Sequence, residues 1–312
     1  MTDREMMSSS PLAASSQSTF LVGCPRSGTT LLQSIIASHP AVVSPPETHF
    51  FRLVCPKKRV LRYAKIASRD ARAALLRLAD LLDVPISPPN SVLVKSYERL
   101  FFQAMDQYSV RNRKSHWVEK TPSHLHYIPQ IEAVRPETKF VHVLRNGYDT
   151  IASLHHVTRA YPSKWGGARS LQECVERWIS DVLWSCEYAR GDNHLLVRLE
   201  QVLRYPRRSA RAMCRFLNLP DASATMVEEA GVTAQRVIEK DEPWKGRNIE
   251  PISRNTISSF NRYLLPKDQE EVYRIVRLKL EEVERKRGKR VARFVYRLLQ
   301  EPRSNSHCAV PV

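Results

Sequence analysis

Short apolar runs alternate along this chain with segments whose apolar residues recur every three or four positions. The runs are rich in β-branched and aromatic residues and end at glycine, proline or a charged residue, which is typical of buried parallel strands. The other segments, such as 29–38 with Leu31, Leu32, Ile35 and Ile36 on one stripe, are typical of amphipathic helices. The pattern predicts strands at 19–23, 116–121, 139–144 and 194–199, and helices at 29–38, 60–82, 97–108, 147–156, 171–188 and 209–220.

The order of these elements predicts the fold class. Strands and helices alternate, so the strands are expected to pair in parallel and the helices to cover both faces of the sheet. We therefore expect a three-layer α/β fold with a mostly parallel central sheet. No internal repeat or low-complexity domain divides the chain, so residues 19–300 are expected to form one domain, with flexible tails at 1–18 and 301–312.

The charge of the chain directs attention to anionic ligands. Its 312 residues carry a formal net charge of +17, which attracts nucleic acid, an acidic membrane face, or phosphorylated and sulfated small molecules. The six cysteines include no C-x-x-C pair, which favours reduced thiols over a disulfide framework or a zinc site. Residues 1–19 lack the apolar run of a signal peptide, and no apolar run is long enough to span a membrane. We expect a cytoplasmic protein.

The turn after the first predicted strand is the first candidate site. From Gly23 the sequence continues with four residues, Gly28, Thr29 and Thr30, and Arg26 lies inside this loop. A nucleoside-triphosphate loop would have a lysine in place of Thr29. Backbone N–H groups at a helix N-terminus, hydroxyl groups and a guanidinium are together suited to bind a phosphate-like anion. The alternative is a glycine-containing turn that holds no ligand.

A second turn follows the strand at 139–144. Arg145 leaves the strand, and Ser153 lies eight residues later, about two turns into the next helix, so both can reach one phosphate. Triphosphate chemistry would need an acidic residue at a strand end to hold Mg²⁺. Asp149 lies inside the helix instead and is poorly placed for that role. The two turns therefore predict an anion site without a metal.

These two turns resemble those of a known family. "PRSGTT" at 25–30 is similar to the 5′-phosphosulfate loop of the sulfotransferases that use 3′-phosphoadenosine-5′-phosphosulfate (PAPS), and "LRNGYDTIAS" at 144–153 is similar to their 3′-phosphate motif. The likeness covers residues 20–265 and is greatest to the tyrosylprotein and bacterial branches, which carry arginine in the loop. It implies a P-loop NTPase-like fold, PAPS as co-substrate and no metal. The cofactor-binding residues that it implies are Pro25, Arg26, Ser27, Gly28, Thr29, Thr30, Arg145 and Ser153.

The same resemblance implies a reaction, the transfer of the sulfuryl group of PAPS to an acceptor hydroxyl. Glu47, which is 21 residues after Arg26, resembles the general base of the arginine-loop branch. Arg26 and Lys120 are expected to stabilise the charge that builds on the bridging oxygen. His49 and His124 are competing bases, because an imidazole titrates near neutral pH.

The sequence also departs from the family pattern. Leu199 stands where relatives commonly have a tyrosine near the nucleotide, and the basic C-terminal nucleotide motif of cytosolic members is not evident. Lys245, Gly246 and Arg247 are candidates to replace that motif. Two alternatives to a sulfotransferase stay open: a nucleotide kinase with a degenerate loop, and a non-catalytic module that binds anions.

The basic segment 285–297 contains seven arginine or lysine residues and no acid. Apolar residues from Val291 to Leu299 fall at helical spacing between them. One interpretation is a basic amphipathic helix, residues 285–299, on an anionic membrane that presents a lipid-linked acceptor. The other is a terminal helix packed on the domain with a solvated basic face. No nucleic-acid-binding motif accompanies the segment, so nucleic acid is not expected as a partner.

Overall fold

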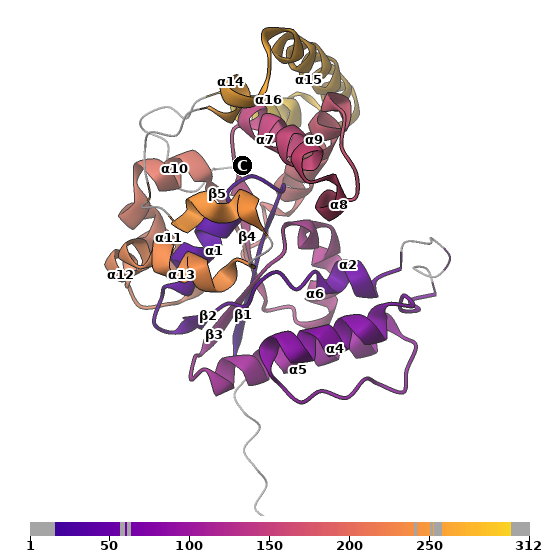
Figure 1. Cartoon of the computed structure of the whole chain (residues 1–312), viewed down its shortest axis with the longest axis vertical. Coiled ribbons are helices and arrows are strands. Elements are labelled where there is room, and N and C mark those ends of the chain that lie inside the picture. Colours follow the sequence, from indigo (N-terminus) through magenta and orange to yellow (C-terminus); the bar gives the residue numbers. More distant parts are fainter. Residues whose placement is uncertain are drawn as a thin grey trace, which may run out of the picture.

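A computed structural model describes residues 16–56, 60, 64–239, 242–249, 252 and 258–300. Its centre is a five-stranded sheet with the strand order β2-β3-β1-β4-β5, and every neighbouring pair is parallel (Figure 1). The strands are β1 Gln17–Gly23, β2 Val42–Val43, β3 His116–Lys120, β4 Lys139–Leu144 and β5 His194–Arg198. The expected three-layer α/β fold with a parallel central sheet is confirmed.

Helices occupy both faces of the sheet and the connections between strands. The longer ones are α1 Thr29–Ala37, α4 Ala71–Leu82, α5 Val94–Arg111, α7 Gly147–Ala160, α9 Leu171–Tyr188, α11 Pro206–Leu217, α13 Ala230–Val237, α15 Pro266–Arg287 and α16 Lys289–Arg297. The shorter ones are α2 Phe50–Val54, α6 Ile128–Val134, α8 Pro162–Trp165, α10 Leu199–Arg204, α12 Ser223–Glu228 and α14 Ser259–Tyr263. Two 3₁₀ helices are η1 Pro122–Tyr127 and η2 Pro243–Ile249.

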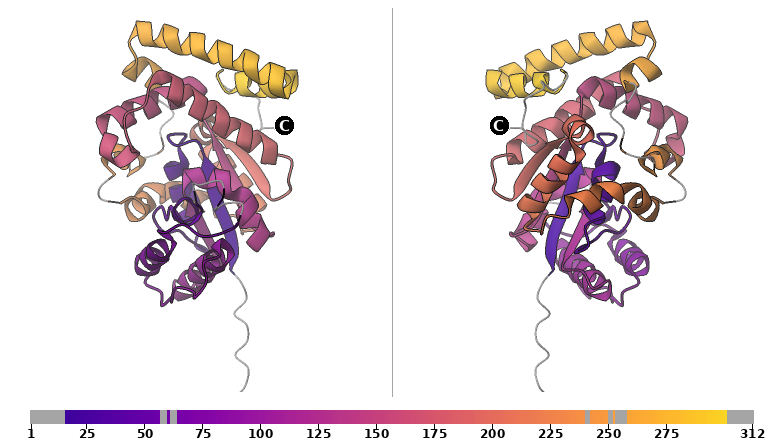
Figure 2. Two further views of the ribbon diagram at one scale, coloured as in Figure 1. Left: turned by 90° about the vertical axis from the view of Figure 1, so that its right-hand side faces the viewer. Right: turned by 90° about the vertical axis from the view of Figure 1, so that its left-hand side faces the viewer.

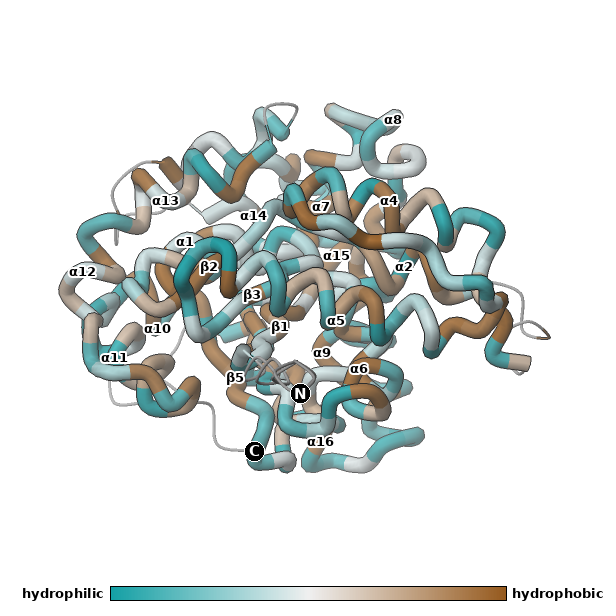
Figure 3. The backbone as a smooth tube through the Cα atoms, turned by 90° about the horizontal axis from the view of Figure 1, so that it is seen from below, coloured by the Kyte–Doolittle hydropathy of each residue, from teal (hydrophilic) through white to brown (hydrophobic). Residues whose placement is uncertain are grey.

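Side chains alternate between the two faces of the sheet, and both faces are buried. Leu21, Val141 and Val197 pack against α1 and α11 on one face. Phe20 and Trp117 pack on the other face against the aromatic residues of α2 and α5. Because both faces are covered, the strands have the continuous apolar runs seen in the sequence rather than an apolar–polar alternation. On the surface helices, by contrast, hydrophobic and hydrophilic stretches alternate (Figure 3).

Three predicted boundaries need correction. β1 begins at Gln17, inside the expected tail 1–18, because Gln17 and Ser18 pair with β3. The short strand β2 was not predicted, because two residues are too few to show a pattern. One continuous helix was expected at 60–82, but Ile66 forms a bridge with Leu93 and α4 spans Ala71–Leu82. Residues 1–15 and 301–312 lie outside the described part of the chain.

The C-terminal helices α15 and α16 lie across one end of the molecule, opposite α4 and α5 (Figure 2). Gly288 separates them. The apolar side of α16 is packed into the domain, where Val295, Leu298 and Leu299 belong to a core cluster with α7 and α9. Within the described residues, no helix is both long and apolar enough to cross a membrane. The basic side of α16 faces outward, whereas its apolar side is already covered by the domain.

Candidate functional site

A cleft of about 620 Å³ opens at the carboxyl end of the central strands. The turns that follow β1 and β4 both line it, with Arg26 from the first and Arg145 from the second. Parallel α/β sheets bind their ligands at this edge, because the loops after neighbouring strands meet there. The cleft is within the usual size range of small-molecule sites, roughly 300–1,000 Å³.

The turn after β1 depends on the backbone of three residues. Arg26 has a φ of 72°, a conformation that is uncommon for residues other than glycine and that concentrates at functional sites. Gly28 has a φ of 95°, and a Cβ added there would lie 2.6 Å from a methyl carbon of Leu199. A Cβ on Gly23 would lie 2.5 Å from the backbone oxygen of Val143. The two glycines therefore allow this turn to pack closely against α10 and β4.

The N-terminus of α1 is suited to an anion. No side chain caps the helix, and its first turn contains no acidic residue. The helix dipole and the N–H groups of the first turn therefore favour a negative group at this end. Thr29 and Thr30 line the cleft beside these groups.

The two arginine-bearing turns are in direct contact. Arg145 donates a hydrogen bond from Nη1 to the backbone oxygen of Arg26 at 3.0 Å, and Arg26 donates from Nε to Ser153 Oγ at 3.2 Å. Arg145 also bonds Ser259 Oγ at 3.0 Å. Burial and the neighbouring charge of Arg145 lower the pKa of Arg26 to about 10. Two guanidinium groups at this proximity repel each other, and a bound anion would relieve that repulsion.

Ser27 departs from the expected arrangement, in which its hydroxyl would face the anion. It is buried and is not among the residues that line the cleft. Its backbone N–H bonds the oxygen of Cys24 at 3.2 Å, and its side chain lies with Cys24, Trp178 and Asp181 beneath the turn. The structure thus places the Ser27 hydroxyl away from the cleft, in contrast to the expectation that it binds the anion.

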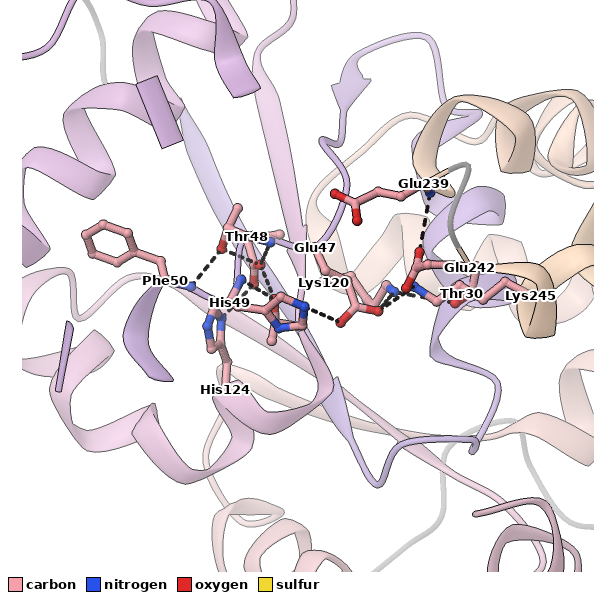
Figure 4. Close-up of polar contacts among 12 residues, drawn as sticks. Thr30, Glu47, Thr48, His49, Phe50, Lys120, His124, Glu239, Glu242 and Lys245 are labelled. Atoms are coloured by element: carbon pink, nitrogen blue, oxygen red, sulfur yellow. Dashed lines mark hydrogen bonds and ion pairs between the residues drawn. The ribbon is translucent and has the colours of Figure 1, made fainter. Parts of the chain in front are cut away.

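The Glu47 carboxylate has two lysines on one side and His49 on the other (Figure 4). Lys120 contacts Glu47 Oε1 and also lies 3.4 Å from Thr30 Oγ1. Lys245, from η2, donates to the same Oε1 at 2.7 Å and pairs with Glu242 at 2.5 Å. The other oxygen of Glu47, Oε2, lies 3.7 Å from His49 Nε2.

The charges in this cluster shift one another's ionisation. Burial alone would raise the pKa of Glu47, but Lys120, Lys245 and His49 together hold it well below its usual range. Burial lowers the pKa of Lys120 to about 8, even with Glu47 beside it. The pKa of Lys245 is raised: its two carboxylate partners outweigh its burial. Burial lowers the pKa of His49, although Glu47 opposes that shift.

A second buried carboxylate, Glu119, holds the segment that carries Glu47. Its Oε1 accepts hydrogen bonds from Thr48 Oγ1 at 2.8 Å and Thr121 Oγ1 at 2.6 Å, and its Oε2 lies 2.8 Å from His124 Nδ1. The other ring nitrogen of His124 accepts from the Phe51 N–H at 3.3 Å. Because His124 is fully buried with both nitrogens engaged, it is not placed to act as a base.

The site also contains residues that the sequence did not assign. Ser259 and Tyr263 of α14 line the cleft beside Arg145, and the backbone oxygen of Trp244 accepts from Arg26 at 3.3 Å. Asp149 accepts from Ser258 Oγ at 2.7 Å and so fixes α14 in place. The motif "PWKGRN" indicated that η2 mattered, although Lys245 was expected to replace a nucleotide motif rather than to contact Glu47.

Leu199, at the expected tyrosine position, lines the cleft against Gly28 and offers only an apolar surface there. Among the described residues, no group of three or more histidine, cysteine, aspartate or glutamate side chains could hold a metal ion. The side chain of Arg247 lies outside the described part of the chain.

Comparisons with known proteins identify the family of the chain. The model of the sulfotransferase family matches residues 18–223. Protein-tyrosine sulfotransferase 1 of Danio rerio is 26% identical over 246 residues, which cover 75% of this chain and 64% of that protein. The nodulation protein NoeE of Sinorhizobium fredii (strain NBRC 101917 / NGR234) is 31% identical over 163 residues, 52% of this chain and 35% of that protein. The matched segment thus spans between a third and two thirds of these relatives.

Solved structures share the fold. The sulfotransferase domain of the Synechococcus PCC 7002 olefin synthase has a TM-score of 0.54 at 20% identity, with 83% of this chain and 93% of that chain covered. Mouse sulfotransferase SULT7A1, complexed with PAP, has a TM-score of 0.53 at 14% identity, with 90% and 88% covered. The family model matches well over half of the chain, and the fold is the P-loop-like fold of these structures. The chain belongs to the sulfotransferase family.

Proposed function

We propose that this protein is a sulfotransferase that uses PAPS and transfers its sulfuryl group to an acceptor hydroxyl. The observation that carries the proposal is the convergence of Arg26 and Arg145 on one cleft, beside Glu47 and Lys120. The PAP found in the mouse structure and the protein-tyrosine relatives support the same donor and a hydroxyl acceptor.

The residues present fit a doubly phosphorylated nucleotide. The uncapped N-terminus of α1, with Arg26, Thr29 and Thr30, would hold the 5′-phosphosulfate end. Arg145 and Ser153 would hold the 3′-phosphate, with Ser259 beside Arg145. PAPS, when bound, supplies an activated sulfuryl group. The transfer of this group leaves 3′-phosphoadenosine 5′-phosphate (PAP).

The residues of the chain have two tasks in the transfer. Glu47 accepts the acceptor's proton, and the bond between the acceptor oxygen and sulfur forms as the bond between sulfur and the phosphate oxygen breaks. A hydroxyl becomes far more acidic as its oxygen bonds sulfur, so a carboxylate with a low pKa suffices if it is ionised and positioned. Lys120 and Arg26 stabilise the electron pair left on the phosphate oxygen by fixed positive charge.

Titration calorimetry with PAP tests the proposal. Wild-type protein is expected to bind PAP without added metal, and Arg145→Ala to bind it about 10–100-fold more weakly, because a charge-assisted phosphate contact is lost. Arg159→Ala is the matched control, since Arg159 is exposed on α7, the helix that follows Arg145, and does not line the cleft. Equal affinity of Arg145→Ala and wild type, or binding of ATP with Mg²⁺ in preference to PAP, would contradict the proposal.

A further inference from the structure

Lys245 contacts the proposed base from a segment 198 residues away in sequence. Lys120 and Lys245 both engage the same oxygen of Glu47, Oε1, whereas among the described residues the ion-pair contact of Oε2 is with the more distant His49 nitrogen. We propose that Lys245 is a positioning residue for Glu47: with Lys120 it fixes Oε1 and leaves Oε2 as the atom that accepts the acceptor's proton. This inference rests on the proposed function.

Lys245 and Glu47 form a largely buried ion pair rather than a surface ion pair. Its side chain is 7% exposed and that of Glu47 is 12% exposed. Surface ion pairs contribute little, but a buried ammonium requires partners for its charge. Lys245 pairs with both Glu47 and Glu242, so two carboxylates compensate its charge.

The two lysines are not equivalent. Lys120 is fully buried with Glu47 as its carboxylate partner, and its pKa falls to about 8. Lys245 is shared between two carboxylates, and its pKa is raised. Lys245 therefore keeps its proton at alkaline pH values where Lys120 loses it. Its hold on Oε1 is present across the whole neutral and mildly alkaline range.

The two lysine contacts fix the orientation of the Glu47 carboxylate. A carboxylate whose two oxygens were equally free could rotate about its last bond and present either oxygen. With two ammonium groups on Oε1, rotation would break both contacts, so Oε2 keeps a fixed direction. A small misplacement of a catalytic group costs up to about 100-fold in rate.

Two variants separate this role from a merely structural salt bridge. Lys245→Met and Glu242→Gln both break the pair between Lys245 and Glu242, but only Lys245→Met removes the cation from Glu47. Lys267→Met is the control, because Lys267 is exposed at the start of α15 and does not line the cleft.

The first measurement does not need an acceptor. In protein labelled with ¹³C at the glutamate carboxyl carbons, Glu47→Gln identifies the Glu47 resonance. We expect this resonance in Lys245→Met to titrate at higher pH than in wild type, because one of its cations is gone, and in Glu242→Gln to show no upward shift. PAP affinity should change by less than about twofold in both variants, since in the structure Lys245 pairs with Glu47 and Glu242 and was not found in its expected nucleotide role.

The second measurement is transfer from PAPS to 4-nitrophenol, for which kcat of Lys245→Met should fall about 10–100-fold and that of Glu242→Gln much less. An unshifted Glu47 titration in Lys245→Met, or a loss of PAP affinity without a loss of kcat, would overturn the inference. Failure of the wild type to bind PAP would instead overturn the proposed function. If Lys245→Met does not fold, Lys245→Arg takes its place, and a retained kcat in that variant supports the inference. A Glu47 resonance that titrates at higher pH in Glu242→Gln than in wild type overturns it.

Discussion

Two regions of the molecule concentrate positive charge in opposite ways. The basic surface of α15 and α16 carries seven cations within 13 residues, all of them exposed: Arg285, Lys286, Arg287, Lys289, Arg290, Arg293 and Arg297. The proposed site uses four cations, Arg26, Lys120, Arg145 and Lys245, and each of them is buried or partly buried. Lys120 is fully buried, and the side chain of Arg145 is 17% exposed.

Charge density along the sequence therefore does not locate the chemistry of this molecule. Exposed cations are hydrated and screened over roughly 8 Å at physiological salt, so they act as a weak general field. Cations removed from water act strongly on whatever lies beside them, as the low pKa of Glu47 shows. The residues that line the cleft come from many segments spread between Pro25 and Tyr263.

The largest effect is expected for Glu47→Gln, which removes the proton acceptor and keeps its shape. Transfer to 4-nitrophenol should fall about 10²–10⁴-fold, the usual contribution of a general base. Stability should fall as well, because Lys120 then has a buried charge with no carboxylate beside it. Rates from transfer assays and unfolding curves in urea check both expectations.

Glu281→Gln is the matched control for that variant, since Glu281 is exposed on α15. Transfer by Glu47→Gln at the wild-type rate would mean that another group accepts the proton. His49 would then be the candidate, because it lines the cleft and its side chain is 42% exposed.

Much of the fold and of the cleft's outline could be predicted from the sequence. The helix 171–188 has the predicted bounds, because Ser170 and Glu173 form a capping box at its start. The two arginine turns were predicted to share a site, and both line the cleft, because β1 and β4 are neighbours and the ends of parallel strands meet at one edge. Local sequence and chain topology suffice for both.

The parts that were missed depend on contacts between distant segments. Lys245 and Glu47 are 198 residues apart, and no local pattern pairs them. Ser27 lies beneath the turn with Trp178 and Asp181, which are more than 150 residues away in sequence. Glu119 gave a signal that could have been used: a charge inside a fully buried strand needs a partner, although the sequence does not say which.

A smaller effect on activity is expected from a change of pH. It tests whether burial sets the charge state of Lys120. Lys120 is protonated below its pKa of about 8 and loses its charge above it. We therefore expect kcat/KM, which reports the free enzyme, to fall as the pH rises through about 8. Lys120→Arg should move this alkaline limb upward, because a guanidinium keeps its proton. An alkaline limb at the same pH in Lys120→Arg would show that another group causes it.

The smallest effect is expected from the basic surface. In the triple variant Arg287→Glu, Lys289→Glu and Arg293→Glu, the net charge falls by six, yet none of these residues lines the cleft. Since such charges are screened over roughly 8 Å at 0.15 M salt, PAP affinity there should change by less than about twofold. At low salt it should weaken more, because the long-range field then reaches the cleft. A loss at 0.15 M as large as that of Arg145→Ala would mean that the two regions act together, and the distinction between buried and exposed cations would fail.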